Sequence, residues 1–220
     1  MNPIVQLAAG AALAAALSVP AIAASVHVEI RGSVDYNVIR GDLNGIPSGA
    51  PVVLGFNLDS TDFVDSPNYS TRGYRIDLAS FDMNFGGVHI GLDNPQPYGD
   101  AFFVLRDNDP AVDGFFMSQG SVEWPLSLTV HIPGLAPEHE FDFSRTFDNG
   151  TTLHSLNILD AVGSYGFENM SSYMWTIGRF GNPGAEVAYE SISITAVPEP
   201  STLALLGAGL LVVMRRARKA

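Results

Sequence analysis

The stretch "VHVEI" (Val26–Ile30) alternates apolar and polar side chains along its whole length. The three apolar residues fall on one face, and His27 and Glu29 fall on the other. This period of two predicts a β-strand with one buried face and one solvated face. The segment "LSLTVHI" (Leu126–Ile132) repeats the alternation and predicts a second strand of the same kind.

Further strands are predicted over Pro51–Leu58, Ala101–Arg106, Gly114–Ser118, Thr152–Leu159 and Tyr173–Phe180. Two longer segments change the parity of their apolar positions. The change comes near Ala79 within Tyr74–Phe85, and between Tyr189 and Ile192 within Ala185–Ala196. A β-bulge at each point would keep both halves of the segment facing the core.

The body of the chain, residues 24–196, shows no amphipathic helix of ten or more residues. Turn-forming strings such as "GDLNG" (Gly41–Gly45) and "DNPQPYGD" (Asp93–Asp100) separate the strand segments instead. Parallel sheets need crossover helices, so the strands are expected to pair antiparallel. We expect an all-β domain, an antiparallel β-sandwich or jelly-roll-like body of roughly nine to eleven short strands.

The composition excludes several classes of function. The chain has no cysteine, which removes disulfides, thiolate metal sites and cysteine nucleophiles. Residues 25–197 hold 22 acidic residues against seven arginines and no lysine, a net charge of −15 with histidine neutral. Such a body would repel phosphates, so no nucleic-acid partner is expected. The acidity is explained either by solubility outside the cell or by divalent-cation sites.

The first 23 residues are predicted to be a secretory signal peptide. The segment Met1–Ala24 is apolar and rich in alanine, and Ala21 and Ala23 suit signal peptidase. Cleavage after Ala23 is favoured over cleavage after Ala24. The segment departs from the usual pattern because no basic residue precedes Arg31, and a buried alanine helix is the alternative.

The last 24 residues, 197–220, divide into three parts. The turn-like "VPEP" (Val197–Pro200) precedes an apolar run, Ser201–Met214, predicted to be a transmembrane helix. A basic stretch (residues 215–219) follows, and its charged residues are Arg215, Arg216, Arg218 and Lys219. Fourteen helical residues span ~21 Å, short of the ~30 Å hydrocarbon core, so the segment is a marginal span. The positive-inside rule places the basic stretch in the cytoplasm as a stop-transfer signal.

This order of parts resembles the PEP-CTERM sorting signal, also catalogued as the ice-binding protein C-terminal domain. The resemblance covers about Val197–Lys219, with Val197, Pro198, Glu199 and Pro200 as the sorting motif. It implies processing by an exosortase in the inner membrane near the motif, after signal peptidase has acted at the other end. It also implies an inner-membrane-anchored precursor, a mature form at the cell surface or secreted, and a link to exopolysaccharide and biofilm extracellular matrix.

No catalytic residue is predicted. The chain has no Gly-x-Ser-x-Gly and no His-Glu-x-x-His motif. Two carboxylates beside a cleft would suffice for a glycosidase, and the acidic body neither supports nor excludes such a pair. Several aromatics could stack on sugar rings: Tyr69, Tyr74, Tyr98, Trp124, Tyr165, Tyr173 and Trp175. Of these, Trp124 and Trp175 lie in or beside strands and are expected in the core.

Calcium is the most plausible ligand, and no other cofactor is expected. The string "DNDPAVDG" offers the hard oxygen donors Asp107, Asp109 and Asp113. A second string, "DSTDFVDS" (Asp59–Ser66), offers three more aspartates. Neither has the spacing of an EF-hand loop, and turn-forming aspartates are the alternative explanation.

The expected function is that of an exported, non-enzymatic surface or matrix protein that carries an exosortase sorting tail and contacts extracellular polysaccharide. A secreted carbohydrate-binding module or a glycosidase-like domain is the alternative. A stably anchored, periplasm-facing membrane protein is expected if the host has no exosortase.

Overall fold

The computed structural model describes residues 24–136, 139–179 and 182–197. The predicted signal peptide (1–23) lies outside these ranges. So do Pro198, Glu199 and Pro200, the apolar run 201–214, and the basic residues Arg215, Arg216, Arg218 and Lys219. Among the described residues, no helix combines the length and apolar character needed to cross a membrane.

The described residues form twelve strands and one short 3₁₀ turn. In chain order these are β1 (Ser25–Asn37), η1 (Gly41–Leu43), β2 (Pro51–Asp65), β3 (Thr71–Ile76), β4 (Asp82–Phe85), β5 (Val88–Leu92), β6 (Ala101–Arg106), β7 (Gly114–Gln119), β8 (Leu128–His131), β9 (His139–Phe147), β10 (Gly163–Tyr165), β11 (Met170–Arg179) and β12 (Asn182–Val197).

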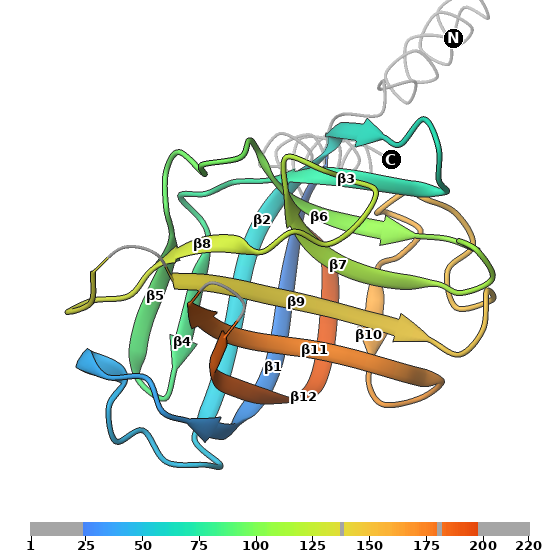
Figure 1. The fold of residues 1–220 in the computed structure, drawn as a ribbon. Helices are drawn as coiled ribbons and strands as arrows, with labels where there is room; N and C mark the ends of the chain where they lie inside the picture. The colour runs from blue at the N-terminus through green and yellow to red at the C-terminus, as the bar shows by residue number, and fades with distance from the viewer. Residues whose placement is uncertain (1–23, 137–138, 180–181, 198–220) are drawn as a thin grey trace, which may run out of the picture.

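The sheet closes on itself. Its neighbours run β1-β12-β11-β9-β7-β6-β3-β2, and β2 pairs back onto β1, so eight antiparallel strands form a closed barrel. In Figure 1, β9 and β11 cross in front of β1 and β2 at a steep angle. The all-β, antiparallel expectation is therefore confirmed. The sandwich or jelly roll is replaced by a barrel, because long strands such as β2 and β12 pair along both edges and leave no open sheet ends.

The wall of the barrel divides between β2 and β9. The first part of β2 pairs with β4, and its later part pairs with β3. In the same way, β9 pairs with β8 near its start and with β7 near its end. Two three-stranded branches, β3-β6-β7 and β4-β5-β8, therefore connect β2 to β9 side by side.

Two buried glutamines form hydrogen bonds at the junction between the two branches. Gln96 lies in the connection from β5 to β6, and its side-chain amide bonds both the carbonyl and the N–H of Thr129 on β8. Gln119, at the end of β7, accepts from the amide of Tyr98 and donates to the carbonyl of Ser127. These side chains supply the hydrogen bonds that a continuous ladder would otherwise make.

The alternation of apolar and polar residues in the sequence determines which side chains are buried in the core. Val26, Val28 and Ile30 are fully buried on β1, while the residues between them are partly exposed. Phenylalanines fill much of the barrel interior, with contacts such as Phe56–Phe103 and Phe103–Phe115 at ring-centroid distances of 5.5 and 5.6 Å. The core is therefore aromatic and continuous. Burial of this apolar surface is the main favourable contribution to the free energy of folding.

One of the two predicted bulges is confirmed. Arg31 pairs with Ser191 and Gly32 with Tyr189, so Glu190 is the extra residue on β12. The bulge predicted near Ala79 is wrong, because a turn in which Ser80 bonds the Asp77 carbonyl separates β3 from β4 there.

The strand predicted over Thr152–Leu159 is also wrong, since these residues form turns and bends. The strand at Ala101–Arg106 has the predicted bounds. The other predicted strands are present with shifted ends, and Phe180 lies outside the described residues.

Candidate functional site

The exposed aromatic pair Tyr69 and Trp124 is the most distinctive feature of the described surface. The Trp124 side chain is 51% exposed and that of Tyr69 46% exposed. Their ring centroids lie 6.5 Å apart with the planes at 79°. We call this pair, with Asn68 and Glu123 beside it, the aromatic platform.

The expectation that both tryptophans lie in the core is half right. Trp175 is 1% exposed and packs edge-on against Phe143 inside the barrel. The prediction for Trp124 is wrong, because this residue lies in the connection 120–127 between β7 and β8, outside the barrel wall.

A small second core holds this connection in place. Val122 packs with Phe102, Val104 and Phe116, which form a cluster separate from the main core. Gly73 on β3 lets the connection approach closely, since a Cβ there would lie 2.4 Å from Val122 Cγ1. The connection is therefore packed against strands rather than free in solvent.

Hydrogen bonds join the two loops that carry the platform. The hydroxyl of Ser66 donates to Glu123 Oε1 at 2.9 Å, and it accepts from the amides of Asn68 and Tyr69, both at 3.0 Å. The side chain of Asn68 donates to the same Glu123 oxygen at 2.8 Å. A buried Thr71 hydroxyl adds a third link by donating to the Val122 carbonyl at 2.6 Å.

The backbone of Trp124 is fixed from the barrel side as well. The fully buried hydroxyl of Ser118 on β7 donates to the Trp124 carbonyl and accepts from the Leu126 amide, each at 3.1 Å. The backbone that carries the indole is thus set before any ligand arrives.

Several polar groups of the platform are available for a ligand. None of the described residues hydrogen-bonds to Glu123 Oε2, to the indole N–H of Trp124 or to the hydroxyl of Tyr69. The site therefore combines two ring faces with one acceptor carboxylate oxygen and two donor groups. This combination suits a ligand with an apolar face and polar edges.

The sequence suggests Tyr69 as one of several stacking aromatics, but it places Trp124 in the core and gives no binding role to Ser66, Asn68 or Glu123. Each ring follows directly on a polar residue of the network, Asn68 before Tyr69 and Glu123 before Trp124. That local pattern is the only signal the sequence offers for the pairing of the two loops.

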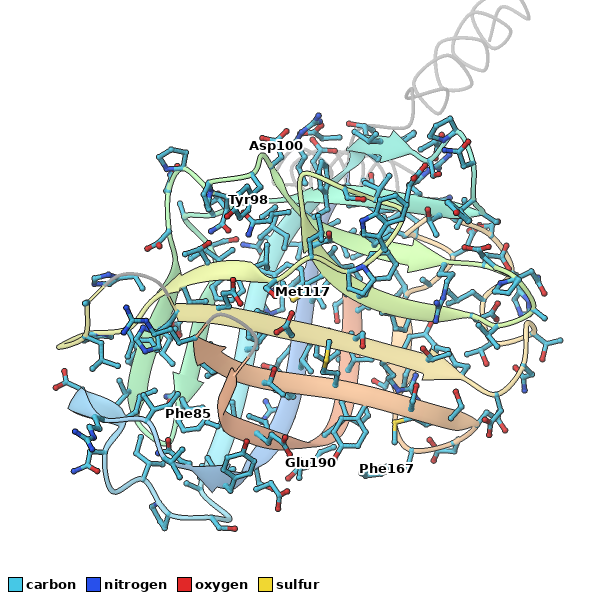
Figure 2. The ribbon with its side chains drawn as sticks, viewed as in Figure 1. Phe85, Tyr98, Asp100, Met117, Phe167 and Glu190 are labelled. Atoms are coloured by element: carbon cyan, nitrogen blue, oxygen red, sulfur yellow. The ribbon has the colours of Figure 1, made fainter. Side chains whose placement is uncertain are left out.

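A group of charged residues lies at the end of the barrel where β1 begins. Arg75 binds both Asp62 and Asp100, the latter at 2.8 Å, and Arg72 binds Asp65 at 2.6 Å. Hydrogen bonds to Asp100 and then Asp62 raise the pKa of Arg75, and the bond to Asp65 raises that of Arg72. These exposed ion pairs hold loops in register and add little stability. Asp100 and its neighbour Tyr98 are labelled in Figure 2.

The structure gives the predicted calcium residues different surroundings. Asp113 is fully buried, and its two oxygens accept from the amides of Asn108 and Leu153 at 2.9 and 2.7 Å. Asp107 accepts from the Asn108 side chain, and the Asp109 carboxylate is attracted to the Arg106 guanidinium. In the described part of the chain, no three acidic or histidine side chains converge as a metal-binding group.

The second aspartate string is divided in the same way. Asp59 accepts from the amide and hydroxyl of Thr61, while Asp62 and Asp65 bind arginines. These contacts are those of turn and ion-pair residues.

Of the sorting motif, only Val197 is described. It is the last residue of β12 and pairs with Ser25, the first residue of β1. Ser25 also pairs with Asp59 on β2. Both ends of the described body therefore leave the barrel at the same edge.

Residues 196–219 match the family model for the PEP-CTERM protein-sorting motif. The predicted resemblance is thereby confirmed for the tail. The motif implies an exported protein that is processed by an exosortase from a membrane-anchored precursor and sorted to the cell surface. No curated protein and no solved structure matches the chain.

Proposed function

We propose that the barrel is a non-enzymatic protein of the cell surface or of the extracellular polysaccharide matrix. The supporting observation is the direct attachment of the sorting motif to the barrel. The motif begins at residue 196, within β12, and Val197 is still paired with Ser25. Only three residues separate Val197 from the predicted apolar run, a reach of ~10 Å when extended. The precursor thus holds its barrel against the outer face of the inner membrane until it is cut.

The arrangement of the carboxylates supports a role without catalysis. A glycosidase needs two carboxyl groups on either side of an open cleft. Here the two shallow hollows at the barrel end share Arg75, and its guanidinium binds one carboxylate from each, Asp62 and Asp100. The cation thus stands between the two carboxylates, where a substrate would have to lie.

A carbohydrate-binding module is the second candidate function. One observation favours it, the exposed and pre-positioned pair of Tyr69 and Trp124. Binding of this kind is compatible with the matrix role, since a matrix protein has to hold on to the polymer around it.

Intact-mass spectrometry of the protein from its native host tests the proposed sorting. We expect the wild-type protein to lack both ends, and the protein from an exosortase-deficient strain to keep its tail. Replacing Pro198, Glu199 and Pro200 with alanine should retain the protein in the membrane. The matched control is Thr195→Ala, an exposed strand position just before the motif.

A wild-type protein that keeps its C-terminus would contradict the proposal. In that case the protein is the stably anchored, periplasm-facing membrane protein that we expect in a host without an exosortase.

A further inference from the structure

We propose that the aromatic platform binds neutral or amino-sugar-containing polysaccharide and discriminates against acidic polysaccharide. The choice of ligand class rests on the proposed extracellular role. The choice of site and the preference for charge rest on Tyr69, Trp124, Glu123 and the charge of the barrel.

The first step is the pre-organisation of the rings. Ser66, Asn68 and Thr71 tie the loop of Tyr69 to the loop of Trp124, and Ser118 fixes the Trp124 backbone. Ordering loops and side chains on binding normally costs affinity. Here the loops are ordered by the protein's own hydrogen bonds, although the rings themselves remain about half exposed. Large aromatics held in this way are typical anchors of a binding surface.

The second step is the geometry of the pair. Rings at 79° and 6.5 Å form a corner rather than a flat strip. A pyranose has an apolar face of C–H groups and a rim of hydroxyls, so it can place that face on one ring and its rim against the other. The pair has only two rings, so we expect the platform to recognise a short element of the polymer.

The third step is the charge. The unpaired oxygen of Glu123 accepts hydrogen bonds from hydroxyl groups and attracts an ammonium group, such as that of an amino sugar. It repels the carboxylates of a uronic acid. The net charge of −15 over residues 25–197 acts in the same direction at longer range. Arg72, on the strand that follows the loop of Tyr69, is already bound to Asp65 and lies over the ring of Phe63.

Tryptophan fluorescence gives a direct readout, because the chain has two tryptophans and only Trp124 is exposed. The protein purified from its host, with whichever ends it carries, would be titrated with N-acetylglucosamine oligomers, their deacetylated cationic forms, and alginate oligomers. We expect quenching and a blue shift with the first two probes and none with alginate. Tyr69→Ala and Trp124→Phe should each weaken binding about tenfold. Fluorescence measures the affinity of Tyr69→Ala, and calorimetry measures the affinity of both variants.

The matched control is Tyr98→Ala, because Tyr98 is 74% exposed and its ring stacks on neither ring of the platform. It should bind like the wild type. Glu123→Gln should bind the neutral oligomers with unchanged affinity and should lose part of its preference for the cationic oligomers. Melting temperatures of all variants would separate loss of the site from loss of the fold.

Three outcomes would overturn the proposal. The first is the absence of binding to the neutral and cationic probes, and the second is an equal loss in Tyr98→Ala. The third is a fluorescence change with phosphatidylglycerol vesicles and with no sugar, which would assign the platform to lipid. None of these depends on processing, so the mass-spectrometric test of the proposed function can fail or succeed independently.

Discussion

The hydroxyl of Tyr74 accepts a hydrogen bond from the amide of Ile158 at 3.0 Å. The same hydroxyl donates to the carbonyl of Leu156 at 2.8 Å. Tyr74 belongs to β3 and the other two residues to the connection between β9 and β10. One buried side chain therefore fixes a segment that lies 82 to 84 positions away in the sequence.

Replacing Tyr74 with phenylalanine is expected to lower the free energy of unfolding by about 1–3 kcal/mol. The ring would still fill the core, but the Leu156 carbonyl and the Ile158 amide would lose their buried partner. Urea denaturation measures the change. Tyr173→Phe is the matched control, since Tyr173 is exposed and its hydroxyl bonds to none of the described residues. Equal stabilities of the two variants would contradict the assignment.

The same segment shows what the sequence could and could not predict. The strand at Ala101–Arg106 could be predicted because it is a short continuous apolar run, and the structure buries its first five residues on both faces of the strand. The apolar residues of Thr152–Leu159 looked equally strand-like. The amides of Leu153 and Ile158 bond the side chains of Asp113 and Tyr74 instead of a neighbouring strand, and no local pattern reveals such partners.

Closure of the barrel and the aromatic platform could not be predicted from the sequence for a related reason. Both depend on contacts between distant segments, such as the pairing of Ser25 with Val197 and the bond from Ser66 to Glu123. The sequence indicated which residues are apolar or polar. It did not indicate that β2 continues through the acidic stretch to Asp65, where it pairs with Arg72 of β3.

Asp113→Ala is expected to destabilise the protein by about 2–4 kcal/mol. Its carboxylate satisfies the amides of Asn108 and Leu153 in a buried position, and alanine would leave both amides without a partner. Chemical denaturation at pH 7 gives the change. The exposed Asp148→Asn serves as control and should be within about 0.5 kcal/mol of the wild type. A harmless Asp113→Ala would show that the buried bonds do not hold the loop.

Calcium is expected to leave the melting temperature unchanged. Both oxygens of Asp113 are already occupied by backbone amides, which leaves the loop 107–113 without one of its three candidate ligands. A ligand present at one hundred times its Kd would stabilise the fold by about 2.7 kcal/mol. Differential scanning calorimetry with millimolar CaCl₂ and with EDTA therefore decides the point. A rise of several degrees with CaCl₂ would restore the calcium site.

Alkaline pH is expected to destabilise the barrel through Tyr189. Burial raises the pKa of Tyr189 to about 12, against an ordinary value of 10.0. The folded state therefore keeps a proton that the unfolded chain loses between about pH 10 and 12, so the stabilisation present below pH 10 declines over that window. The full loss from this group is about 2–3 kcal/mol and is reached above pH 12, and about half of it is expected at pH 11. Urea denaturation at pH 8 and pH 11 measures it, and Tyr189→Phe should show a smaller decline than the wild type.

Gln96→Glu is expected to be more damaging at neutral pH than at acidic pH. The amide nitrogen of Gln96 donates to the carbonyls of Asp93 and Thr129, and its oxygen accepts from the Thr129 amide, all at 2.8 Å. An ionised glutamate would place a second acceptor against those carbonyls in a buried site, a cost of about 2–4 kcal/mol. Protonation would return a donor, so the deficit relative to the wild type should shrink as the pH falls toward 4. Hydrogen exchange at the Thr129 amide would localise the effect, and Gln96→Ala, which loses the bonds at every pH, is the control. A deficit independent of pH in Gln96→Glu would show that the junction between the two branches does not depend on this donor.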